Sequence, residues 1–211
     1  MSISITITDS IANIEKNINK GIADYINDIL NKKQNLILQE AKALIPDWVN
    51  SQPEIISLAS SNTSSLVGLF GIAGDTTSII NSIVKSVVDA TTITFVKYTD
   101  KLKGAGLQLE FQPSNFSNLL LLNAGHTIYD GGDLHWLDWL LKRGDKVIIT
   151  NYHYNPSTGL GRSGLGNMIQ GGSFRVPPQF AGTDDNNFIT RAFNGPTQEK
   201  QLTSIFEKVF K

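Results

Sequence analysis

The feature that most constrains this chain is a stripe of isoleucines near its N-terminus. In a segment otherwise rich in Asn, Lys and Asp, apolar residues recur three and four positions apart: Ile11, Ile14, Ile18, Ile22, Tyr25, Ile26 and Ile29. This spacing predicts a long amphipathic helix with one apolar face, and such a face must pack against something. We expect Thr8 or Asp9 to cap the helix and Pro46 to end it.

The residues before this helix alternate in character. Ile3, Ile5 and Ile7 are separated by Ser and Thr, and this period of two predicts a strand or extended arm with one apolar face. An unpaired strand edge can add to the sheet of a neighbouring molecule. We therefore divide the chain into an arm and long helix (1–45) and a core domain with a C-terminal helix (46–211).

The core domain contains helices and strands in unequal blocks. The residue patterns predict a helix capped by Asp75 or Thr76, a hairpin turning near 103–106, and a helix that Asp133 caps and Gly144 ends. Residues 146–155 form the strongest predicted strand, and residues 197–211 a final amphipathic helix. Because no β-α-β alternation occurs, the predicted class is α+β, with a mixed, mainly antiparallel sheet packed with helices.

Composition excludes several functional classes. The 211 residues include 18 basic and 19 acidic side chains, so the chain has no positive surplus to hold nucleic acid by bulk charge. The absence of cysteine excludes disulfides, thiolate metal sites and thiol nucleophiles. We see neither a signal peptide nor an apolar run long enough to span a bilayer. We therefore expect a protein that stays in the cytoplasm after synthesis or is assembled there.

One stretch matches a nucleotide-binding motif in its sequence pattern. Gly159, Gly161 and Gly164 fit the G-x-G-x-x-G pattern, and Asp184 and Asp185 lie about where a ribose-binding acid would be. The pattern acts through a helix that begins at the glycines and points its N-terminus at the pyrophosphate. The glycines and prolines of residues 167–178 argue against such a helix, so we interpret residues 159–167 as a loop able to order on contact.

Other candidate chemistry lies between residues 126 and 138. This segment holds two histidines and three carboxylates that could ligate a metal such as zinc, namely His126, Asp130, Asp133, His135 and Asp138. Their spacing matches no H-E-x-x-H pattern, and simpler uses exist: Asp133 as a helix cap, Asp138 beside Lys142, and surface histidines. Ser163 lacks the G-x-S-x-G setting of a hydrolase nucleophile.

Trp136 and Trp139 lie three residues apart among leucines. Such a pair could stack on sugars or bases, but its helical spacing favours a core or a subunit interface.

Three segments of the chain resemble virion proteins of tailed bacteriophages, and most closely the head-tail connector, or tail-completion, proteins of the neck. These segments are "LHWLDWLLKRGDKVIITNYHYN", "GRSGLGNMI" and "FRVPPQFAGTDDNNFITRAF". The resemblance includes the Gly-flanked Arg162 and Ser163 and the turn at Gly182 and Thr183. The long N-terminal helix departs from a minimal connector; it could be an arm for neighbouring subunits, or a sign of a tail or baseplate position.

The resemblance implies a structural virion protein, assembled in the host cytoplasm, that forms a ring of identical subunits between the capsid portal and the tail. A tail-terminator or baseplate subunit is the alternative, and a small metal-dependent hydrolase using His126 and His135 a remoter one. The expected partners are copies of itself, other neck and tail proteins, and passing genomic DNA, contacted without sequence specificity. We expect no membrane partner, no cofactor, no metal and no catalytic residue. The interface candidates are Ile3, Ile5, Ile7, Trp136, Trp139, Phe174, Phe180, Phe188 and, for ion pairs or DNA, Arg162, Arg175 and Arg191.

Overall fold

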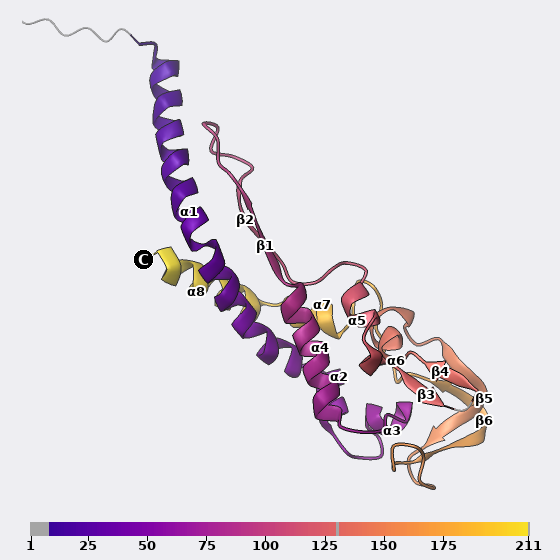
Figure 1. The fold of residues 1–211 in the computed structure, drawn as a ribbon. Helices are drawn as coiled ribbons and strands as arrows, with labels where there is room; N and C mark the ends of the chain where they lie inside the picture. Colours follow the sequence, from indigo (N-terminus) through magenta and orange to yellow (C-terminus); the bar gives the residue numbers. More distant parts are fainter. Residues whose placement is uncertain (1–8, 130, 211) are drawn as a thin grey trace, which may run out of the picture.

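The computed structural model describes residues 9–129 and 131–210, and it has an elongated outline (Figure 1). The helices are α1 (Ile11–Asn50), α2 (Pro53–Ala59), α3 (Leu66–Phe70), α4 (Thr76–Ala90), α5 (Ser117–Leu120), η1 (Asn123–Gly125), α6 (Trp136–Asp138), the π-helix η2 (Trp139–Arg143), α7 (Phe188–Phe193) and α8 (Pro196–Phe210). The strands are β1 (Thr92–Val96), β2 (Gly106–Glu110), β3 (Thr127–Tyr129), β4 (Gly132–Leu134), β5 (Val147–Asn155) and β6 (Asn167–Arg175). These elements confirm the α+β class.

Helix α1 is 40 residues long, and both of its ends differ from the prediction. Its N-cap is Ser10, whose side chain accepts a hydrogen bond from the Asn13 backbone N–H, so Asp9 lies outside the helix. Thr8 falls outside the described residues, as does the predicted arm of Ile3, Ile5 and Ile7.

At its other end, α1 continues through Pro46 to Asn50. Proline removes one intrahelical hydrogen bond, which usually ends or kinks a helix. Here Ile45, Trp48 and Val49 are buried in the core, and their packing stabilises the turn that Pro46 weakens. The helix therefore crosses the boundary that we expected between residues 45 and 46.

The middle of α1 packs against the C-terminal helix α8. Ile37 and Ala41 of α1 form a buried cluster with Ile205 and Val209 of α8. Two polar contacts join the same helices: the Trp48 indole N–H donates to Gln201 Oε1 at 2.7 Å, and Lys208 Nζ lies 3.0 Å from Glu40 Oε1. These contacts link the first and last helices of the described chain.

The β1–β2 hairpin lies along the outer part of α1 (Figure 1). Its strands are antiparallel, with Thr92 opposite Glu110 and Val96 opposite Gly106, and its tip includes the predicted turn. The Asn27 side chain holds the hairpin by pairing with the Tyr98 backbone: Nδ2 donates to the carbonyl at 2.9 Å, and Oδ1 accepts from the N–H at 2.8 Å. We call residues 11–30 of α1 together with this hairpin the stalk.

The rest of the molecule, which we call the head, contains the main hydrophobic core. The core joins the end of α1 to α2, α3, α4, α6, η2 and α7. Its largest fully buried side chains include Leu58, Trp136 and Phe188, from three segments far apart in the sequence. Trp48 adds edge-to-face contacts with Phe111 and Phe193.

The strands do not form the single mixed sheet that we expected. They pair as three separate antiparallel ribbons, β1–β2, β3–β4 and β5–β6. Each ribbon is a local hairpin, and helical segments separate the three along the chain, so their edges do not meet. The predicted strand at 146–155 is confirmed as β5, which pairs with β6.

The turn at Gly182 connects this last ribbon to α7. A Cβ atom at Gly182 would overlap the Leu140 carbonyl, so only glycine fits. Asn187 follows as a fully buried capping residue: its Oδ1 accepts from the N–H groups of Ile189 and Thr190, and its Nδ2 donates to the Leu141 carbonyl at 3.2 Å. Residues 182–187 thus fasten α7 onto η2.

An ion pair with a buried carboxylate joins α7 to α2. The Glu54 side chain is 1% exposed, and its Oε1 accepts from Arg191 Nη2, while Arg191 Nη1 donates to Asn186 Oδ1 at 3.0 Å. Glu54 Oε2 has no hydrogen-bond partner among the described residues. Among the described residues, Arg191 alone therefore compensates the negative charge of the buried Glu54 carboxylate.

Removing this arginine should destabilise the head. In Arg191→Met, the buried Glu54 charge loses its partner, and we expect the free energy of unfolding to fall by about 3 kcal/mol. Urea denaturation followed by circular dichroism measures the change. The double variant Glu54→Gln/Arg191→Met should recover part of the loss, and exposed Arg175→Met should change little; equal stabilities for the wild type and Arg191→Met would contradict this role.

Candidate assembly surface and a cavity beside the glycine-rich loop

The stalk exposes an apolar surface that nothing else in the described chain covers. Ile11 is 76% exposed, Ile18 56%, Ile22 42% and Tyr25 70%. With half-buried Ile14, these residues follow one another at spacings of three and four, so they lie on one face of α1. We call this set, Ile11, Ile14, Ile18, Ile22 and Tyr25, the α1 stripe.

A different face of α1 serves the molecule's own packing. Ala23 and Leu30 are the buried residues in the outer half of the helix. At the ~100° per residue of an α-helix, they lie about 120–140° around the axis from the centre of the α1 stripe. The hairpin and the stripe therefore occupy separate faces, and the intramolecular fold leaves the stripe facing outward.

The α1 stripe extends beyond the hairpin's support. Between residues 11 and 22 no side chain is buried, and only Ile14 and Asn19 are half-buried. Figure 1 shows this end of α1 projecting past the tip of the hairpin. A protruding helix gains little from tertiary contacts, and isolated helices of this length are marginal in water.

The aromatic interface candidates serve the core instead. Trp136, Phe174 and Phe188 are at most 4% exposed and pack inside the head, so they are not available to a neighbour. Trp139 and Phe180 are half-buried against the same core, and the Arg143 guanidinium lies 5.3 Å from the Trp139 ring. We correct the assignment of the three buried rings: their helical and strand spacing reflects intramolecular packing.

Two of the three arginine candidates also have partners within the chain. Arg191 pairs with Glu54, as described above. Arg162 folds back onto β3, where it donates to the Ile128 carbonyl and lies 5.4 Å from the Tyr129 ring centre. Only Arg175, exposed at the end of β6, keeps the free position that we expected of all three.

The glycine-rich segment forms the loop of the β5–β6 hairpin. The Gly161 N–H donates to the Gly166 carbonyl, and the Gly164 N–H donates to the Gly161 carbonyl at 2.9 Å, so the loop closes on itself. Strand β6 begins at Asn167, where a dinucleotide site would need a helix. The residues that match G-x-G-x-x-G therefore form a tight hairpin loop.

One glycine of this loop and one of α3 allow Tyr154 to pass close to the backbone. A Cβ at Gly68 or Gly166 would overlap the Tyr154 hydroxyl, which donates to the Thr63 carbonyl at 2.6 Å. Burial raises the pKa of Tyr154, which keeps this phenol uncharged. The contact ties the hairpin to the segment that precedes α3.

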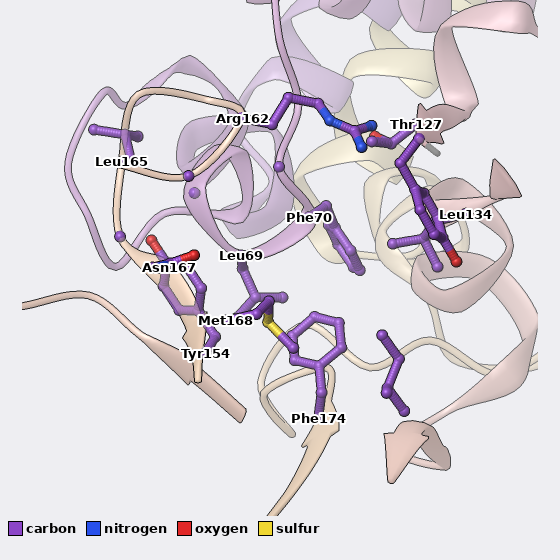
Figure 2. Close-up of a pocket in the computed structure, with 16 residues that line it drawn as sticks. Leu69, Phe70, Thr127, Leu134, Tyr154, Arg162, Leu165, Asn167, Met168 and Phe174 are labelled. Atoms are coloured by element: carbon purple, nitrogen blue, oxygen red, sulfur yellow. The ribbon is translucent and has the colours of Figure 1, made fainter. Parts of the chain in front are cut away.

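A cavity of about 250 Å³ lies among α3, β3, β4 and the β5–β6 hairpin. Leu69, Phe70, Leu134, Met168 and Phe174 form its apolar walls (Figure 2). Arg162 and Thr127 lie together at one end, and Arg162 is the one charged residue among the described lining residues. Thr127 is 8% exposed, and its hydroxyl has no hydrogen-bond partner in the described chain.

The histidines form a stacked pair beside this cavity. The His126 and His135 rings lie 3.9 Å apart between centres, and His126 Nδ1 lies 2.8 Å from Asp133 Oδ2. Asp133 belongs to β4, so it does not cap the following helix as we predicted, and Asp138 pairs with Arg143 rather than Lys142. Among the described residues, which exclude Asp130, no group of three His, Cys, Asp or Glu could hold a metal ion.

Sequence reasoning missed several exposed apolar residues. Leu160 is 84% exposed at the tip of the glycine-rich loop, and Ile128 78% exposed on β3. Neither carries a periodic signal that separates it from a core residue. The α1 stripe did carry such a signal, but the sequence alone could not show that the stripe lies outside the fold.

No helix in the described part of the chain is both long enough and apolar enough to cross a membrane. Comparisons with protein-family models, with curated proteins and with solved structures found no match for the chain.

The histidine pair predicts a pH dependence of stability. Burial, followed by the charge of His126, lowers the pKa of His135 below its ordinary 6.5. Since the unfolded chain then binds a proton more readily than the folded one, this histidine's contribution to stability is complete above pH 6.5 and declines as the pH falls toward the lowered pKa.

We expect the free energy of unfolding to fall between pH 7.5 and 5.5, and to fall less in His135→Phe, which keeps a ring for stacking but cannot be protonated. Urea denaturation at the two pH values measures both slopes. Identical slopes in the two proteins would contradict the assignment to His135.

Proposed function

We propose that this protein is a non-enzymatic structural subunit that assembles with copies of itself through the α1 stripe. The observation that carries the proposal is a row of exposed isoleucines on a helix face that the chain's own hairpin does not use. A contiguous apolar surface on a projecting element is typical of an interaction site.

The spacing of the stripe favours a second α1 helix as its partner. Ile11, Ile18 and Tyr25 are seven residues apart, and Ile22 lies between the last two, which matches the seam of a coiled coil. The seam is narrow, as helix pairing requires, and asparagines and mixed charges surround it. A parallel arrangement keeps every head at the same end of the stalks, so the heads do not obstruct the contact.

We further propose that the assembly is a ring in the virion of a tailed phage, as a head-tail connector or tail-completion subunit of the neck. This part of the proposal rests on the resemblance of the segments around residues 134–193. Parallel stalks around one axis are compatible with a closed cyclic assembly, in which unlike patches of neighbouring heads meet. Exposed Arg175 remains a candidate for contacts with a neighbour or with DNA phosphates.

The stripe can be tested by replacing two of its residues. Each large apolar side chain buried at an interface contributes about 1.5–3 kcal/mol. In Ile18→Asp/Ile22→Asp, both contributions are lost and like charges face each other, so we expect at least about a hundredfold weaker self-association. Sedimentation velocity over a range of concentrations measures the change.

Lys20→Asp provides the matched control, since it adds the same side chain on the opposite side of the same turns. We expect its association and helix content to equal those of the wild type. Unchanged association in the double variant would contradict a role for the α1 stripe.

The virion location needs a separate experiment. Native mass spectrometry and electron microscopy of the purified protein should show closed rings, and labelled antibodies should locate the protein at the neck of intact particles. A protein that stays monomeric at high concentration and is missing from particles would contradict the proposal, whereas labelling at the tail tip would favour the baseplate alternative.

A further inference from the structure

Beyond assembly, the geometry points to a binding site for a small organic carboxylate in the cavity beside the glycine-rich loop. We propose that the ligand is an apolar group about the size of one aromatic side chain, bearing a carboxylate that binds to Arg162 and Thr127. The site lies in the head, away from the α1 stripe, so it can be tested separately from the stripe.

The size of the cavity limits the ligand. Its volume of about 250 Å³ is just below the ~300–1,000 Å³ of pockets that hold drug-sized molecules. A nucleotide or a sugar chain is therefore too large, whereas one ring with a short side chain fits. Leu69, Phe70, Leu134, Met168 and Phe174 surround this space with apolar atoms, which favour a hydrocarbon body (Figure 2).

The polar end of the cavity determines the headgroup. The Thr127 hydroxyl is buried without a partner among the described residues, and a buried polar group in that state is destabilising. A ligand oxygen at this position would satisfy it. Figure 2 shows the Arg162 side chain reaching the same end of the cavity.

The positive charge of Arg162 favours an anionic ligand oxygen at this position. Its Nη1 donates to the Ile128 carbonyl, but a guanidinium has five N–H donors in a planar fork that matches a carboxylate. No Asp or Glu is among the described lining residues, and the Tyr154 phenol is neutral and already bonded to Thr63. A carboxylate at this end would therefore meet donors and a positive charge without a competing anion.

The loop holds Arg162 in position at the cavity. Arg162 lies between Gly161 and Gly164, in a loop closed by two backbone hydrogen bonds, and the ring of Tyr129 holds its guanidinium over β3. The same arginine therefore lines the cavity and links the loop to β3.

The test uses 3-phenylpropionate and its neutral isostere 3-phenylpropanamide, titrated into the full-length protein by calorimetry. Hydrogen bonds to charged groups are about twice as strong as neutral ones, so we expect the acid to bind at least about tenfold more tightly than the amide. Shifts of the Met168 methyl resonance in NMR spectra locate the bound acid in this cavity.

Three variants test the headgroup. Arg162→Gln should weaken binding of the acid at least about tenfold and leave the amide nearly unchanged, and Thr127→Val, which keeps the side-chain shape, should weaken both ligands. The matched control is Arg175→Gln, an exposed arginine on the same hairpin outside the cavity, which should bind both ligands like the wild type.

N-acetylphenylalanine distinguishes two sources of the carboxylate, because it presents the same ring and carboxylate behind a peptide bond. Tighter binding than 3-phenylpropionate indicates the C-terminal residue of a protein, and weaker binding indicates a free organic acid; both results support the site. Equal affinities for the acid and the amide, no effect of Arg162→Gln, or no binding of any of the three compounds would overturn it.

Discussion

The packing of the second half of α1 supports the rest of the molecule. Ile37 and Ala41 join α8, and Ile45, Trp48 and Val49 enter the core of the head. This buried half fixes a helical template, and a helix extends from an existing turn far more easily than it nucleates a new one. The outer half of α1 projects because the inner half is anchored, and the α1 stripe is presented as a consequence.

The anchoring also explains why a proline lies inside the helix. Pro46 loses one backbone hydrogen bond, but its neighbours on both sides are held in the core, so the final turn stays formed. Sequence rules place helix ends at such residues because they describe local preference alone. Tertiary packing overrode that preference here, as it did at Asp133, where pairing with β3 replaced the predicted cap.

Helices and strands with a strong periodic pattern of apolar residues were predictable from the sequence. What each apolar face packs against was not. The long helix, the helix after Asp75 and the strand at 146–155 each carry a repeating pattern that the structure confirms. Trp136 and Phe188 carry the same kind of pattern, and burial in a core or in an interface produces the same spacing. The cavity lining was beyond reach, because Thr127, Arg162 and Met168 are brought together only by the fold.

The central claim is that the α1 stripe of one molecule packs against the α1 stripe of another, and the absence of cysteine makes a direct measurement possible. Ile18→Cys introduces a single thiol within the seam, and Lys20→Cys introduces one on the opposite side of the helix. If parallel α1 helices meet along the stripe, mild oxidation should link Ile18→Cys into disulfide-bonded dimers rapidly and leave Lys20→Cys largely monomeric on a non-reducing gel. Cross-linking of the two variants at equal rates would contradict the account.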